Sequence, residues 1–213
     1  AHQRFEWGQV DRLWELSENA AAICVEVPPC PDEEAIKFIS QCRTACDLSG
    51  AIFILDEVVT GFRLGLQGAA GRYTGRYGVK PDIACYGKAM SATGCVSAIV
   101  GRADLVDLLD TPVFYSTTFG GSPGPCAVAA ATVGWLTANR VEAYEHLDRI
   151  GAALQHGLND LHYNCMGQPE RSVCVFPTDA DWLAWCRAMI ERGVMVHRPQ
   201  FPCLNHTLED VAQ

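Results

Sequence analysis

Two side chains that could carry out chemistry, a carboxylate and an amine, each follow a predicted strand. Asp56, with Glu57 after it, comes directly after the apolar run 51–55, and Lys88 follows residues 82–86 and a glycine that allows a tight turn. Ligands of open α/β sheets bind at the carboxyl ends of such strands. Each residue also has an ordinary structural interpretation, because an acid after a strand often caps a loop and a lysine is usually a solvated surface charge.

The elements that must position these residues form a strand, helix, strand unit. Residues 20–27 are a short apolar run that ends at prolines, which is typical of a parallel-sheet strand buried on both faces. Pro31 and an acidic first turn then open an amphipathic helix that ends near Gly50. Because residues 51–55 form a second apolar run, the order indicates an α/β fold with a mostly parallel sheet and flanking helices.

The rest of the chain continues with alternating strands and helices. We expect strands at 82–86, 97–100 and 172–176, and helices at 126–138, 141–161 and 182–192. Residues 166–169 are polar and loop-like, and the domain boundary is placed just before them, giving domains 1–162 and 163–213.

Composition limits the classes of function. The formal net charge is −9 and there is no Lys/Arg block, so neither nucleic acid nor an anionic membrane surface is an expected partner. No apolar run is long enough to span a bilayer, and the first residues do not resemble a signal peptide, so we expect a cytoplasmic protein whose partner is a small molecule or another subunit.

The cysteines and histidines are expected to be structural. Eleven cysteines are scattered, odd in number and partly inside apolar runs, which favours reduced thiols over a disulfide scaffold. The nearest approach to a metal-binding pattern is Cys203 with His206 and His197, and such a pair is usually incidental. We therefore predict no metal.

Four stretches, taken together and in order, are more specific than any single residue. They are VEVP at 25–28, LDEVVTGFR at 55–63, YGVKPDIACYGK at 77–88 and STTFGGSP at 116–123. In these stretches the chain resembles the class III pyridoxal-phosphate aminotransferases of fold type I, and within them the glutamate-1-semialdehyde aminomutase-like branch. The resemblance implies an enzyme that moves an amino group between or within small amino and keto substrates.

The resemblance also implies roles for single residues. Lys88 would hold pyridoxal 5′-phosphate as a Schiff base and later move the substrate proton. Asp56 would hydrogen-bond the pyridine nitrogen of the cofactor, and Val58 would pack on the ring. Thr118 would donate to the cofactor phosphate from the neighbouring subunit, which implies a homodimer.

Two further residues match the family pattern and have open roles. Glu26 matches a family glutamate, although Val27 stands where proline is usual, and a local structural role is an equal alternative. Arg63 could bind a substrate carboxylate or form a structural ion pair.

The chain also departs from the family pattern. Family members are much longer, and neither the phosphate-binding Gly-Ser/Thr segment nor the aromatic residue that stacks on the cofactor is found here. The chain therefore resembles a C-terminal half: the remainder of the cofactor-binding large domain at 1–162 and a shortened α+β small domain at 163–213. A separate N-terminal half chain is one expected partner. A truncated, non-catalytic dimerisation module and a pyridoxal-phosphate enzyme of another reaction type are the alternatives.

Overall fold

The computed structural model describes residues 2–28, 33–74, 79–110, 113, 114, 116, 118 and 120–212. The chain divides into two compact units, Ala1–Arg140 and Val141–Gln213, and each is described by itself. The boundary expected between residues 162 and 163 falls inside the second unit, and the division into domains stays a prediction.

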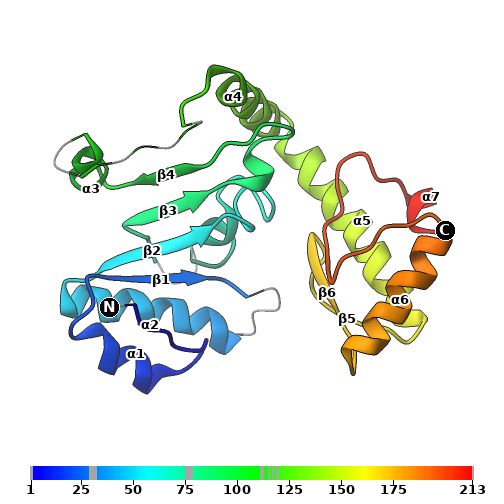
Figure 1. Ribbon diagram of the computed structural model, residues 1–213, viewed down its shortest axis with the longest axis horizontal. Coiled ribbons are helices and arrows are strands. Elements are labelled where there is room, and N and C mark those ends of the chain that lie inside the picture. Colours follow the sequence, from blue (N-terminus) through cyan, green and yellow to red (C-terminus); the bar gives the residue numbers. More distant parts are fainter. Residues whose placement is uncertain are drawn as a thin grey trace. The chain divides into compact units, whose positions relative to one another are not determined.

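The first unit is built on a four-stranded sheet. Its strands are β1 (Ala22–Glu26), β2 (Ile52–Glu57), β3 (Ile83–Tyr86) and β4 (Ala98–Gly101), and they lie side by side in this order (Figure 1). The first three are parallel, and β4 is antiparallel to β3. Helix α2 (Glu33–Ser49) links β1 to β2, so the predicted crossover unit is confirmed. Pro31 and Asp32, expected in its first turn, lie outside the described residues.

One face of this sheet packs on the core of the unit. Helix α1 (Val10–Ser17), which the sequence did not reveal, contacts α2, and α2 contacts β1 and β2. The largest fully buried side chains between these elements are those of Leu13, Phe38, Ile39, Phe53 and Leu55.

The opposite face of β1 is open, which corrects the expectation of burial on both faces. Ile23 and Val25 are buried, whereas Ala22, Cys24 and Glu26 are exposed. The physical reason is that, within the described parts of the chain, helices pack against β1 from one side.

Shorter elements and one long helix complete the first unit. They are the π-helix η1 (Ala70–Thr74), the 3₁₀ helix η3 (Lys88–Met90), α3 (Ala103–Val106), the 3₁₀ helix η4 (Asp107–Leu109) and α4 (Pro123–Ala138). In α4, of all the residues described, only Ala129 and Leu136 are buried, although the helix is almost wholly apolar.

The second unit combines helices with a small antiparallel sheet. Its elements are α5 (Arg140–Asp160), β5 (Asn164–Gln168), β6 (Arg171–Val175), α6 (Asp179–Glu191), β7 (Pro199–Gln200) and α7 (Leu208–Val211). The strands are ordered β5-β6-β7. The expectation of a loop at 166–169 was wrong, because this polar stretch pairs with β6 to form most of β5. Helix α6 begins earlier than expected because Thr178 and Asp181 form a capping box.

Asp82 ties β3 to its neighbours at the end of the sheet opposite to Lys88. Its Oδ2 accepts hydrogen bonds from the Phe53 N–H and the Arg43 guanidinium, both at 2.8 Å, and its Oδ1 accepts one from Arg102 at 3.1 Å. Burial alone would raise the pKa of Asp82, but these three hydrogen bonds together lower it.

We expect Asp82→Ala to lower the free energy of unfolding by about 2 kcal/mol at pH 7, because it leaves the buried Phe53 N–H without its acceptor and removes one of the two carboxylates that pair with Arg43. A lowered carboxyl pKa stabilises the fold above the unfolded value near pH 4, and this stabilisation is lost as the pH falls through the folded pKa. Urea unfolding at pH 7 and pH 3 should therefore give a smaller difference between wild type and variant at pH 3. Asp104→Ala, at an exposed partner of Arg102, is the control and should change stability much less.

Candidate functional site

Asp56 and Lys88 lie at the carboxyl ends of adjacent parallel strands, at one edge of the sheet. In the register, Asp56 of β2 pairs with Glu26 of β1 on one side and with Cys85 of β3 on the other. Lys88 follows Cys85 by three residues and begins η3. The Oδ1 atom of Asp56 accepts a hydrogen bond from the Val58 N–H at 2.9 Å, which fixes the orientation of the carboxylate.

The backbone at Lys88 is strained. Its φ is +41°, in the left-handed region that side chains other than glycine rarely adopt, and this conformation costs about 1 kcal/mol. The turn is held by hydrogen bonds from Met90 N–H to the Gly87 carbonyl (3.0 Å) and from Ser91 N–H to the Lys88 carbonyl (3.1 Å). The side chain of Lys88 is exposed. Strain of this kind at a strand end is a reason to infer a functional role.

Val58 lies beside the turn that carries Lys88. A Cβ atom placed on Gly87 would be 3.6 Å from Cγ1 of Val58, so the valine side chain packs against the residue before the lysine. The carboxylate of Asp56, the apolar side chain of Val58 and the Lys88 turn therefore belong to one locality at the sheet edge.

Glu57 is a positioning residue that the sequence pattern identified only as the neighbour of Asp56. Its side chain is fully buried and accepts hydrogen bonds from the Thr60 hydroxyl, from Ala69 N–H at 2.9 Å and from Ala70 N–H at 2.7 Å. Burial raises the pKa of Glu57 even though these bonds act to lower it. Glu57 thereby ties the loop after β2 back onto the core. The sequence signal that could have identified this buried position is the alternation along a strand, because adjacent residues point to opposite faces.

Tyr86 fixes the same loop from the neighbouring strand. Its ring contacts that of Phe62, with 5.5 Å between the centroids, and it packs so closely on Gly61 that a side chain there would collide with it. Burial, with a smaller effect of the Glu57 charge, raises the pKa of Tyr86. A glycine is therefore required at position 61.

The remaining predicted site residues are Glu26, Arg63 and Thr118. Glu26 is exposed at the end of β1, next to Asp56 in the register. Arg63 is half-buried on the loop after β2, and Thr118 is exposed in a turn between residues that lie outside the described part. The register and contacts above bring together Glu26, Asp56, Val58 and Lys88, and they do not extend to Arg63 or Thr118.

A metal site and a membrane-spanning helix are two features that the sequence does not predict. Among the residues that the structure describes, no three His, Cys, Asp or Glu side chains gather as a metal site would require. His206 accepts a hydrogen bond at Nδ1 from the Cys203 N–H at 3.0 Å, which gives that residue pair a local structural role. None of the helices described has the length and apolar character needed to cross a membrane.

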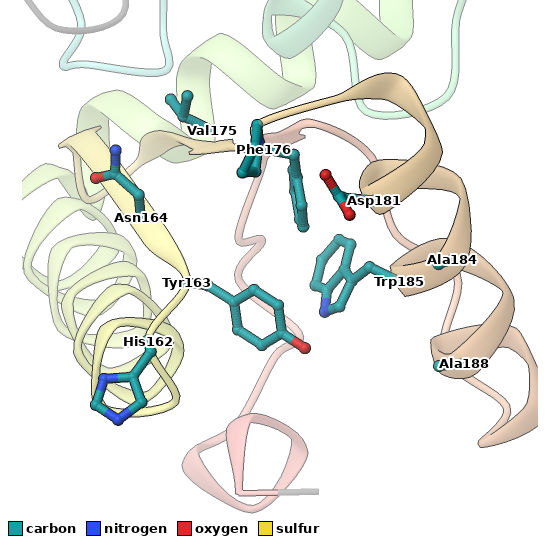
Figure 2. A pocket seen from close by; sticks show the side chains of 10 residues that line it. His162, Tyr163, Asn164, Val175, Phe176, Asp181, Ala184, Trp185 and Ala188 are labelled. Carbon is teal, nitrogen blue, oxygen red and sulfur yellow. The ribbon is translucent and has the colours of Figure 1, made fainter.

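A pocket of about 700 Å³ lies in the second unit. Figure 2 shows Tyr163, Phe176 and Trp185 on its wall, with Asp181 at one end. The aromatic rings pack on one another, with 5.3 Å between the centroids of Phe176 and Trp185. The pocket includes neither Asp56 nor Lys88, and their strand-end position is the stronger indication of a site.

We expect Glu57→Ala to lower the free energy of unfolding by about 2–4 kcal/mol, because two buried donors and one partly buried donor lose their acceptor. Urea unfolding measures the loss, and Glu34→Ala, at an exposed glutamate of α2, is the control. A loss no larger than that of the control would mean that Glu57 does not anchor the loop.

Comparison with known proteins identifies the family. Residues 15–172 match the family model Aminotransferase class-III. The glutamate-1-semialdehyde 2,1-aminomutases of Clostridium tetani and Thermomicrobium roseum are 39% and 35% identical to the chain, over 70% and 94% of its length and over 36% and 52% of their own.

Solved structures show the same fold. The ornithine aminotransferase of Toxoplasma gondii ME49 matches with a TM-score of 0.81 and 26% identity, over 99% of this chain and 53% of that protein. The FumI protein of Sphingopyxis sp. MTA144, solved in its PLP internal aldimine form, matches with a TM-score of 0.84 and 24% identity, over 99% and 54% of the two chains. These likenesses confirm the expected α/β fold of the fold type I enzymes.

The chain spans about half, or less, of the length of the relatives that it matches. The family model nevertheless covers most of this chain, including β1 to β4 and the Lys88 turn. The chain therefore belongs to the class-III aminotransferase family.

Proposed function

We propose that this chain is part of an enzyme that uses pyridoxal 5′-phosphate to move an amino group between or within small amino and keto substrates. The observation that carries the proposal is the placement of Asp56 and the strained Lys88 at the carboxyl ends of adjacent parallel strands, with Val58 between them. These residues fit the cofactor, since they offer a carboxylate, an amine and an apolar side chain in one locality. When bound, pyridoxal phosphate supplies an aldehyde and an electron-withdrawing ring that stabilises negative charge on the substrate.

The chain's own residues then have separate tasks. Asp56 accepts a hydrogen bond from the pyridine nitrogen and keeps it protonated, and the Val58 N–H holds the carboxylate in place for this task. Val58 packs on the ring. Lys88 would hold the cofactor through its amine, and the same amine, when free, would move the proton at the substrate carbon. Glu57 keeps the loop that carries Val58 against the core.

The active enzyme is a homodimer in this proposal. Thr118 is exposed, as a residue that reaches a neighbouring subunit must be, and it donates to the cofactor phosphate across the interface. Arg63 binds a substrate carboxylate, with a structural ion pair as the alternative. Glu26 lies next to Asp56 in the register and belongs to the substrate side of the site, with a local structural role as its alternative.

The open face of the sheet supports a further part of the proposal. The side chains of Ala22 and Cys24 are exposed and those of Ile52 and Ile54 are only half-buried on this face, whereas parallel sheets are normally covered on both faces. The relatives have about twice the length that this chain matches. We infer that residues equivalent to the unmatched half of the relatives cover this face. They belong either to the same polypeptide or to a separate N-terminal half chain. The cytoplasmic location expected from the sequence stays a prediction.

Covalent labelling tests the role of Lys88. The chain has three lysines, Lys37, Lys80 and Lys88, so borohydride reduction in the presence of pyridoxal phosphate followed by peptide mapping can assign the labelled amine. Together with the residues that complete the enzyme, we expect the label on Lys88 and its loss in Lys88→Arg, because the guanidinium is a poor nucleophile. Lys37→Arg and Lys80→Arg are the matched controls and should keep it. Equal labelling of all three lysines would refute the proposed role.

The role of Asp56 is tested by kinetics. We expect Asp56→Ala to lower the rate of amino transfer by about 100-fold, which corresponds to the loss of one charge-assisted hydrogen bond of about 3 kcal/mol. The rate is measured under single-turnover conditions at saturating cofactor, and Asp160→Ala, at an exposed residue of α5, is the control. A variant that retains full activity would exclude Asp56 as the partner of the pyridine nitrogen. An enzyme that labels at Lys88 but transfers no amino group would instead favour another reaction type.

A further inference from the structure

The second unit holds two cysteines directly opposite each other on neighbouring strands. Cys165 of β5 pairs with Cys174 of β6 in the antiparallel register, and both are buried, with 4% and 1% of their surface exposed. Residues directly opposite in a sheet point to the same face, so the two sulfur atoms face the same side. Both thiols are free in this structure.

The backbone hydrogen bonds show which kind of cross-strand pair this is. The N–H of Cys165 donates to Oδ1 of Asn159 at 2.8 Å, and its carbonyl accepts from Nδ2 of the same residue at 2.9 Å. The N–H of Cys174 donates to the Arg198 carbonyl at 3.2 Å. These backbone groups therefore form their hydrogen bonds with other residues and not with the opposite cysteine, which makes Cys165 and Cys174 a non-hydrogen-bonded pair. In such non-hydrogen-bonded pairs the Cα atoms are about 4.5 Å apart, which lies within the range that a disulfide spans.

The thiols themselves interact. Cys174 donates a hydrogen bond to Cys165, which lowers the pKa of Cys165. The same hydrogen bond, together with burial, raises the pKa of Cys174. Cys165 also lies on the edge strand β5 and is the more exposed of the two, so we assign it as the attacking sulfur and Cys174 as the resolving one.

Another buried pair of cysteines lacks these properties. Cys42 and Cys46 lie one turn apart on α2, where regular helical geometry keeps their side chains from closing a disulfide. Burial raises the pKa of Cys42 to about 12 and that of Cys46 to about 11. Cys42 and Cys46 therefore serve as an internal negative control for disulfide formation.

We propose that Cys165 and Cys174 form a reversible dithiol–disulfide couple that is oxidised by a small disulfide such as glutathione disulfide. The proposal does not rest on the amino-transfer function, because it is argued from residues of the second unit alone.

The exchange balances as follows. The Cys165 thiolate attacks one sulfur of glutathione disulfide, which breaks its S–S bond and releases one glutathione thiolate. Cys174 loses its proton and attacks the mixed disulfide at the Cys165 sulfur, which releases the second glutathione. The two protein thiols give up two protons and two electrons, and one glutathione disulfide becomes two glutathione thiols.

Two residues that flank the cysteine pair along the chain line a pocket. Tyr163 precedes Cys165 by two residues and Phe176 follows Cys174 by two, their ring centroids are 6.0 Å apart, and both line the pocket shown in Figure 2. The pocket therefore adjoins the cysteine pair, and β5 is an edge strand of its sheet. We expect oxidation to be slower than at the exposed Cys203, because local opening must precede it.

Peptide mapping of the full chain tests the proposal. The chain is treated with glutathione disulfide, alkylated in denaturant and digested with trypsin without reduction. Cleavage after Arg149, Arg171 and Arg187 separates Cys165, in peptide 150–171, from Cys174, in peptide 172–187. Because Cys186 shares the second peptide, the experiment is done on the Cys186→Ser background as well as on wild type.

We expect a linked pair of peptides in both proteins, lost on treatment with dithiothreitol, and no link between the peptides of Cys42 and Cys46. The oxidised chain should also melt about 2–8 °C higher, because the crosslink restricts the unfolded chain, and Cys174→Ala should show no such shift. Alkylated Cys165 and Cys174 alongside glutathionylated Cys203 would overturn the proposal. So would a link that disappears in Cys186→Ser, or a mixed disulfide on Cys165 that is never resolved.

Discussion

Adjacent residues of a β-strand point to opposite faces, and the candidate site depends on this constraint at the end of β2. Asp56 and Glu57 are both carboxylates, yet one lies beside the Lys88 turn and the other is completely buried in the core. A shift of the register by one residue would exchange them and place the residue that anchors the loop in the site. The network of donors around Glu57 opposes such a shift, because three hydrogen bonds would be lost. The face of the strand to which each residue points therefore decides that Glu57 anchors the loop and that Asp56 belongs to the candidate site.

The first unit is predictable from sequence because its signals are local. The apolar runs at 20–27 and 51–55 became β1 and β2, and the amphipathic stretch between them became α2. Burial on both faces of β1 was not predictable in the same way. An apolar run shows only that a strand can be covered on two sides, while coverage depends on which other residues are present to pack on it. Cys24, which lies within the apolar run of β1, is therefore exposed.

The parts that sequence reasoning missed depend on distant partners. The strand β5 has a polar sequence, and its position is set by pairing with β6 and by the side chain of Asn159, neither of which has a periodic signal. The anchoring role of Glu57 depends on the N–H groups of Ala69 and Ala70, twelve and thirteen residues later in the chain. For the same reason, cysteine spacing gave no hint of the pairing between Cys165 and Cys174. Asp56 and Lys88, by contrast, lie at strand ends as the sequence indicates, whereas their assignment to a site and their roles stay predictions.

The conformation of Lys88 bears on whether the chain is a catalytic part or only a packing module. A sheet edge that merely packs has no need of a lysine in the left-handed region, and a glycine there would relieve about 1 kcal/mol of strain. The surrounding structure maintains the strain through the hydrogen bonds of the η3 turn and the contact between Gly87 and Val58. A strained lysine turn at the same sheet edge as an oriented carboxylate costs the fold free energy. Its presence favours an enzyme part over the non-catalytic alternative.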